Sequence, residues 1–140
     1  RECMGKSVRE RWSSMGQRSL MNEPTTITAE ERPSGVKIIR IEGDLDSMGT
    51  HMVESKFDAL LAGSNQPVIV DIDKVSFISS AGMAMLLVKG KRLRQQKGQL
   101  VIANANDRVL EVLSLAGFNE LFDLYSSIEE AVSALEPADL

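Results

Sequence analysis

The sequence predicts an α/β domain with a mixed, mostly parallel sheet of about five strands and about four helices. Two observations support this prediction. Strand-like and helix-like segments alternate along most of the chain, and several strand-like segments are short, β-branched and continuously apolar. Alternation favours parallel strands joined by helical crossovers, and continuous apolar runs are typical of strands covered on both faces. The length of 140 residues fits one such domain.

The first half of the pattern begins with a hairpin. Residues 26–31 and 36–43 are strand-like, and the RPSG connection at 32–35 supplies the Pro and Gly of a turn. Residues 50–63 predict a helix that ends at a glycine. Its core side is expected to consist of Met52, Val53, Phe57, Leu60 and Leu61. The β-branched run PVIVDI at 67–72 then predicts a buried strand.

The second half repeats the alternation. A helix is expected from the SSAG turn to about residue 97, and a buried strand follows at 99–105. A helix over 107–117, opened by Asn106 or Asp107, leads to a strand at 120–126 and a last helix opened by Ser126 or Ser127. In the helix before residue 97, the residues expected in the core are Met83, Met85, Leu86, Leu87 and Val88. Those expected on its solvated face are Lys89, Lys91, Arg92, Arg94 and Lys97.

Composition excludes several classes of protein. One cysteine and one histidine offer neither a disulfide framework nor a metal cluster, and a reducing cytoplasm is the expected compartment. The longest apolar run, 81–88, is far shorter than the roughly 20 residues of a membrane span. No cofactor is predicted.

Charge divides the chain unevenly. Residues 1–21 hold five of the 16 basic and two of the 20 acidic residues, and residues 22–140 therefore carry about −7. An acidic body argues against nucleic-acid binding, which requires clustered Lys and Arg. Residues 1–21 are expected to be a tag-derived or disordered extension, and residues 22–140 the domain.

The turn SFISSAGM at 76–83 raises a functional question. It lies where a strand leads into a helix, and helix capping by Ser79 or Ser80 would explain the hydroxyls. Capping does not explain Gly82, because glycine in a first turn costs up to about 1 kcal/mol and implies close approach of another backbone or protein. A second interpretation is a phosphate acceptor, since a helix N-terminus tolerates a phosphoserine while a bound partner experiences its charge.

A catalytic serine is the third interpretation. A nucleophilic serine needs an adjacent base, and the single histidine, His51, is expected to be solvated near a helix start. Asp44 or Asp46 could supply the acid of a Ser/His/Asp triad, but the spacing of these residues does not support one. No Gly-x-Ser-x-Gly elbow occurs either. The sequence therefore predicts that the chain is not an enzyme.

The chain resembles the STAS domain, the family of the anti-sigma factor antagonists, from about residue 26 to 135. The motifs that carry the resemblance are EGDLD at 42–46, the SSAG turn with its helix, and VLEVLSLAG at 109–117. The resemblance implies a single STAS-like domain. It also implies that Ser80 occupies the place of the family's phosphorylated serine, with Ser79 as the alternative, although Ser79 stands where the family has Asp.

The resemblance further implies a switch. The unphosphorylated chain would bind an anti-sigma factor that is also a Ser/Thr kinase and would free a sigma factor. Phosphorylation at Ser80 would release the kinase, and a phosphatase would reset the switch. The expected partner-binding residues are Asp44, Asp46, Ser79, Ser80, Ala81, Gly82 and Met83. The alternative is an interaction subunit of a stress-signalling or lipid-transport complex without phosphoswitching.

Overall fold

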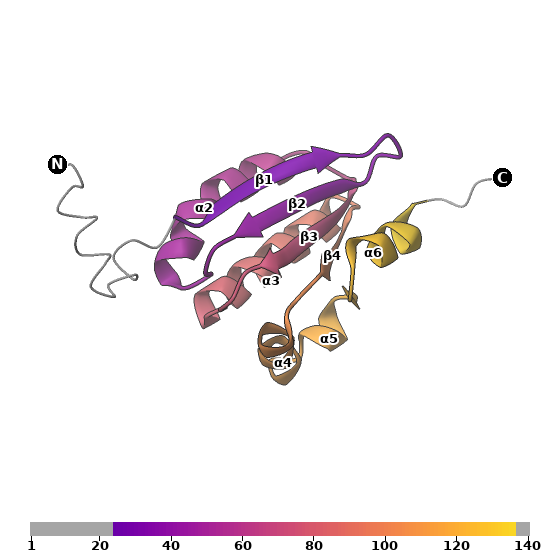
Figure 1. The fold of residues 1–140 in the computed structure, drawn as a ribbon. Coiled ribbons are helices and arrows are strands. Elements are labelled where there is room, and N and C mark those ends of the chain that lie inside the picture. Colours follow the sequence, from indigo (N-terminus) through magenta and orange to yellow (C-terminus); the bar gives the residue numbers. More distant parts are fainter. Residues whose placement is uncertain (1–23, 137–140) are drawn as a thin grey trace, which may run out of the picture.

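A computed structural model describes residues 24–136 as a five-stranded sheet with helices on both faces (Figure 1). The predicted boundary between residues 21 and 22 lies outside the described residues. The elements, in chain order, are β1 (Thr26–Glu31), β2 (Lys37–Glu42), α2 (Ser47–Leu61), β3 (Pro67–Lys74), α3 (Ser80–Gln95), β4 (Gln99–Ala103), α4 (Asp107–Leu115), α5 (Phe118–Leu121), β5 (Leu124–Tyr125) and α6 (Ile128–Leu135).

The strands follow one another across the sheet in the order β1-β2-β3-β4-β5. The β1–β2 hairpin is antiparallel, and each later pair is parallel. This confirms the predicted mixed, mostly parallel sheet. Since β2 to β5 run in the same direction, their carboxyl ends meet at one edge, where the following helices begin.

The two faces of the sheet bury two separate apolar clusters. Ile39, Val70 and Ile102 belong to the larger cluster, which also contains buried residues of α2, α3 and α4. Ile38 and Ile69, which alternate with them, belong to the smaller cluster with α6. The continuous apolar runs in β2 and β3 therefore reflect burial on both faces, as predicted.

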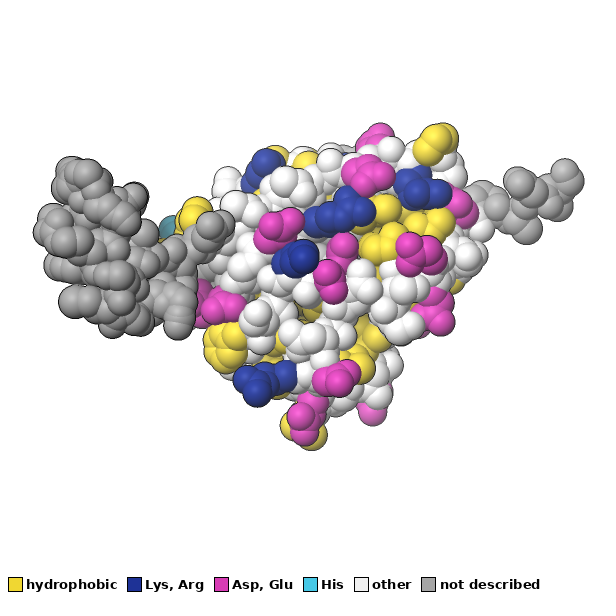
Figure 2. All heavy atoms as spheres, viewed as in Figure 1, with side chains coloured by type: hydrophobic (Ala, Val, Ile, Leu, Met, Phe, Trp, Pro, Cys, Tyr) yellow, Lys and Arg dark blue, Asp and Glu magenta, His cyan; other side chains and the backbone are white. Residues whose placement is uncertain are grey.

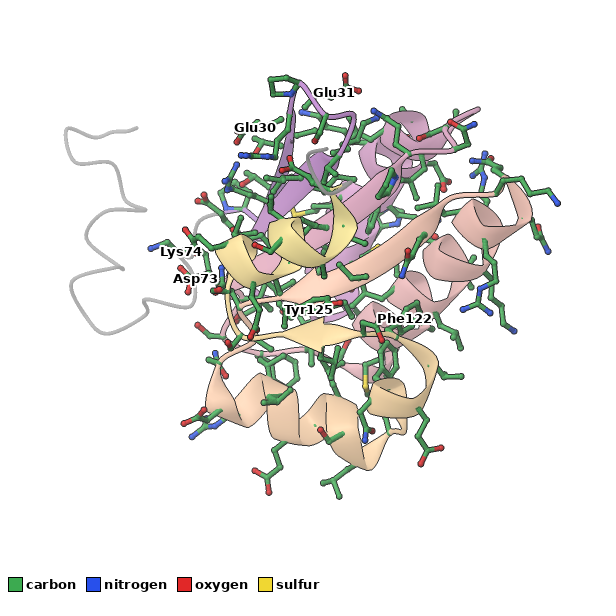
Figure 3. All side chains as sticks on the ribbon, turned by 90° about the vertical axis from the view of Figure 1, so that its right-hand side faces the viewer. Glu30, Glu31, Asp73, Lys74, Phe122 and Tyr125 are labelled. Carbon is green, nitrogen blue, oxygen red and sulfur yellow. The ribbon has the colours of Figure 1, made fainter. Side chains whose placement is uncertain are left out.

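The chain between α4 and β5 differs from the prediction. A strand was expected over 120–126, but Phe118–Leu121 forms α5 and only Leu124–Tyr125 is strand. Phe118 and Phe122 are four residues apart and both buried, with ring centroids 5.3 Å from each other. A helical turn brings residues at this spacing to the same side. Figure 3 shows Phe122 beside α3 and Tyr125 between β5 and α6.

Three side chains of α2 and α3 have a different exposure from the one predicted. Met52 and Val88, expected in the core, are 46% and 54% exposed. Lys89, expected on the solvated face, is buried at 3% exposure. Its ammonium group pairs with Glu54 at 3.1 Å and Asp58 at 2.8 Å, because α2 packs alongside α3 and supplies both carboxylates. The hydrogen bond from Lys89 is the main cause that lowers the pKa of Asp58.

The face of the sheet that carries α6 is charged where α6 does not cover it (Figures 1 and 2). Arg40 of β2 pairs with Glu30 of β1 at 2.7 Å and with Asp71 of β3 at 3.3 Å. Asp73 and Lys74 follow at the carboxyl end of β3 (Figure 3). Asp71 is buried beside Arg40, whereas Asp73 and Lys74 are exposed, so this part of the face presents charges of both signs to solvent.

Glu136, at the end of α6, forms hydrogen bonds with the β1–β2 hairpin. From this contact we expect the fold to lose stability in acid. The Glu136 carboxylate accepts hydrogen bonds from Ser34 Oγ and, at 2.8 Å, from Arg32 Nε. The Ser34 bond, then Arg32, lowers the pKa of Glu136. A carboxyl group with a lowered folded-state pKa stabilises the fold above its unfolded value of about 4.3, and this contribution disappears as pH falls through the folded pKa.

We therefore expect Glu136→Gln to lower the thermal midpoint at neutral pH. The variant should also lose less of that midpoint than wild type on acidification to about pH 3. Glu129, an exposed carboxylate on the same helix, provides the control Glu129→Gln. Identical acid sensitivity of wild type and Glu136→Gln would contradict the assignment.

Candidate functional site

The turns after β2 and β3 run side by side at the carboxyl edge of the sheet. Leu45 and Ile78 form an isolated parallel bridge between them. The Leu45 amide donates to the Phe77 carbonyl at 2.9 Å, and the Leu45 carbonyl accepts from the Ser79 amide at 2.9 Å. These bonds join the GDLD and SSAG turns, which lie more than 30 residues apart in the chain, into one surface.

Ser79 caps α3. Its hydroxyl accepts from the Gly82 amide at 3.2 Å and donates to the Leu45 carbonyl at 2.8 Å. Both functions of this hydroxyl are thus used within the fold, and the residue is half-buried. Helix capping, one of the interpretations of the turn, is confirmed for Ser79.

Ser80 is the first residue of α3, and it is exposed. No hydrogen bond joins its hydroxyl to any other group within residues 24–136. The adjoining first turn directs backbone amides toward this end of the helix, where the macrodipole favours negative charge by about 0.3–1 kcal/mol. Of the two adjacent serines, Ser80 therefore offers the accessible hydroxyl.

Gly82 explains how closely the two turns approach. A Cβ atom at this position would lie 2.8 Å from the Leu45 carbonyl oxygen and 2.9 Å from Cγ1 of Ile78. The close approach inferred from the sequence is therefore made by the chain's own GDLD turn. Gly82 is buried, and it affects the surface by allowing the two turns to approach each other. A direct contact of Gly82 with a partner stays a prediction.

Asp46 and Asp44 provide the acidic part of the surface. Asp46 is exposed and caps α2, since its Oδ1 accepts from the Gly49 amide at 2.7 Å. The cap explains why α2 begins at Ser47, three residues earlier than predicted. Asp44 is half-buried, and its carbonyl accepts from Thr25 Oγ1 at 2.7 Å.

The remaining predicted site residues differ in exposure. Ala81 is exposed beside Ser80, whereas Met83 is half-buried and packs against the larger core cluster. His51 is exposed on α2, as expected for a solvated residue. Segments 43–53 and 75–84 contain no Lys or Arg, and their two carboxyl groups are those of Asp44 and Asp46.

Sequence reasoning missed three apolar side chains near these turns. Met48 is 67% exposed, Met52 46% and Phe77 49%. Met52 was assigned to the core because a helical spacing alone does not show which flank of a helix a neighbour covers. Phe77 carried a usable signal, since it is a large aromatic residue in a turn, outside any regular strand or helix.

Within residues 24–136, no three His, Cys, Asp or Glu side chains lie close enough to hold a metal ion. In the same part of the chain, no helix has the length and apolar character to cross a membrane.

Comparison with known proteins extends this description. BtrV of Bordetella bronchiseptica, which bears the name of an anti-sigma factor antagonist, is 30% identical over 108 residues, covering 77% of this chain and 93% of BtrV. An anti-sigma F factor antagonist from Paenibacillus polymyxa is 25% identical over 107 residues, covering 76% of this chain and 92% of that protein.

Solved structures show the same fold. The anti-sigma factor antagonist SpoIIAA in its unphosphorylated form has a TM-score of 0.65 at 20% identity, covering 78% of this chain and 95% of SpoIIAA. The phosphorylated form of SpoIIAA from Bacillus has a TM-score of 0.62 at 20% identity, covering 79% and 100%. The sequence profile of the STAS domain matches residues 27–131, three quarters of the chain. The chain belongs to the STAS domain family.

Proposed function

We propose that this chain is an anti-sigma factor antagonist controlled by phosphorylation of Ser80. Its unphosphorylated form binds an anti-sigma factor that is also a Ser/Thr kinase and thereby frees a sigma factor. The names of BtrV and the Paenibacillus protein support the first part of the proposal. The observation that carries the second part is the exposed Ser80 hydroxyl at the start of α3, beside a Ser79 hydroxyl already used by the fold.

In the phosphoryl transfer, this chain supplies only the attacking oxygen. The Ser80 oxygen attacks the γ-phosphorus of ATP, the bond to the β-phosphate oxygen breaks, and ADP leaves. The serine proton passes to a base, which together with magnesium belongs to the kinase. This chain is thus a substrate and a ligand, and a separate phosphatase restores the serine. ATP and the sigma factor place the reaction in the cytoplasm.

The phosphate is compatible with the fold of its own domain. It adds about −1.5 to −2 charges at a helix N-terminus, where the macrodipole favours anions. SpoIIAA, whose structure is solved both with and without phosphate, indicates that the fold accommodates such a modification. The added charge acts on the bound partner, which separates release from unfolding.

The test is phosphorylation in solution with the purified chain. Each purified anti-sigma factor kinase of the source genome is incubated with it and Mg-ATP, and the phosphate is located by mass spectrometry. We expect a single modified residue, Ser80, and no modification of Ser80→Ala. Ser79→Asn, which retains a capping oxygen, should still be phosphorylated on Ser80.

Two other outcomes would contradict the proposal. Phosphate on Ser79 alone would show that the capping serine, and not Ser80, is the phosphorylated residue. Binding of an anti-sigma factor without phosphate transfer by any kinase would favour a constitutive interaction subunit, such as one in a stress-signalling or lipid-transport complex.

A further inference from the structure

We propose that Met48, Met52 and Phe77, here called the apolar patch, form the contact by which this chain binds its partner. The inference rests on the proposed function. It adds the chemistry of the partner: an anti-sigma factor whose facing surface is apolar at its centre and carries Lys or Arg at its rim. Ser80 lies on the same edge of the sheet as the patch, which gives a physical reason for release by phosphate.

These three side chains lie outside both apolar clusters of the core. Together they have relative exposures of 46–67%. Met48 and Met52 are four residues apart on α2 and so face the same way, and neither belongs to either core cluster. Of the seven large apolar side chains that are exposed in the part of the chain that the structure describes, these three belong to the two segments of the predicted site. Methionine suits such a surface because it adapts to the shape of a partner.

The three side chains belong to the two segments that carry the predicted site. Phe77 is on the turn that leads to Ser79 and Ser80, and its carbonyl accepts from the Leu45 amide at 2.9 Å. Met48 lies in the first turn of α2, just after the cap Asp46. The two turns and two helix starts thus carry apolar side chains on both the α2 side and the α3 side of one edge.

The charges of this edge specify the rim of the partner. Segments 42–53 and 73–84 carry four carboxylates, those of Glu42, Asp44, Asp46 and Asp73, and one Lys, Lys74. An acidic facing surface would be repelled, whereas a basic rim would be complementary. A central apolar contact with a charged border is also the usual anatomy of a protein interface.

This arrangement accounts for the effect of phosphate. A dianion on Ser80 would have to lose its water beside apolar side chains, and charge transferred to an apolar environment without a partner is costly. The rim cations already face Asp44 and Asp46. Phosphorylation would therefore weaken the complex through the cost of desolvating the phosphate.

The experiment measures the affinity of the full chain for the purified anti-sigma factors of the source genome, titrated one at a time by calorimetry. Met48→Gln and Phe77→Gln should each weaken binding about tenfold or more, as buried anchors do. Leu115→Gln and Leu121→Gln provide matched controls, because these leucines are 82% and 49% exposed on the α4–α5 side of the fold. Each control should change affinity by less than about twofold.

Two further measurements keep folding separate from binding. The thermal midpoints of the four variants should equal that of wild type, since all four side chains are exposed. In methyl NMR spectra, the ε-methyl signals of Met48 and Met52 should shift when the anti-sigma factor is added. The signal of Met85, which is 3% exposed, should stay in place.

The outcomes are distinguishable. If wild type binds an anti-sigma factor and the Met48 and Phe77 variants bind it equally well, the apolar patch is refuted and the proposed function stands. If wild type binds none of the anti-sigma factors, the proposed function fails and the patch fails with it.

Discussion

Ser80→Asp should lose at least about a hundredfold in affinity for the anti-sigma factor that wild type binds, while Ser80→Ala should bind like wild type. A carboxylate that loses its water beside apolar side chains without a cation partner costs several kcal/mol, and about 2.8 kcal/mol is already a hundredfold in affinity. Calorimetric titration of the three proteins measures the difference. Equal binding by Ser80→Ala and Ser80→Asp would contradict the switch.

The stability of Ser80→Asp separates loss of binding from loss of the fold. Aspartate in the first turn of α3 interacts favourably with the helix macrodipole, so the thermal midpoint should stay equal or rise slightly. The matched control is Ser133→Asp, which adds the same charge at an exposed position of α6, far along the chain from both turns. It should bind the anti-sigma factor as wild type does. A fall in the midpoint of Ser80→Asp alone would attribute the loss to unfolding.

Gly49→Ala is expected to have the largest effect on stability, about 3 kcal/mol of unfolding free energy. A Cβ atom on Gly49 would lie 2.0 Å from the Asp44 carbonyl oxygen and 2.5 Å from Thr25 Oγ1. The carbonyl belongs to the backbone of the GDLD turn and accepts the Thr25 hydrogen bond, so it cannot yield without moving the turn. Urea unfolding measures the change.

Helix propensity alone predicts the opposite sign for Gly49→Ala, a gain of about 1 kcal/mol. Ser55→Ala, at an exposed position of the same helix, tests that expectation and should be neutral or slightly stabilising. If Gly49→Ala were as stable as wild type, the Asp44 carbonyl would have to lie farther from α2 than the structure places it. The variant should also weaken anti-sigma factor binding, because Asp44 and Asp46 would move with the turn.

Local patterns predicted most of the elements, since their causes lie within a few residues. The hairpin follows from the Pro and Gly between two β-branched runs, and the parallel strands follow from continuous apolar segments separated by helical ones. Ser79, Asn106 and Ser127 cap helices where polar residues precede apolar periodicity. The predictions failed where exposure depends on a neighbour. Met52, Val88 and Lys89 belong to helices whose flanks differ only in what packs beside them.

The sequence alone determined that the SSAG turn follows a strand and starts a helix, and that its glycine needs an explanation beyond capping. These properties are local, because capping and turn chemistry act over four residues. Only the tertiary structure decided that Ser79 caps the helix and that Ser80 carries the accessible hydroxyl. The carbonyl of Leu45, 34 residues away from Ser79, accepts a hydrogen bond from the Ser79 hydroxyl and fills the space beside Gly82. Ser80 has no such contact among the described residues and is exposed. A contact between two turns on neighbouring strands depends on the register of the sheet, which no local pattern of residues contains.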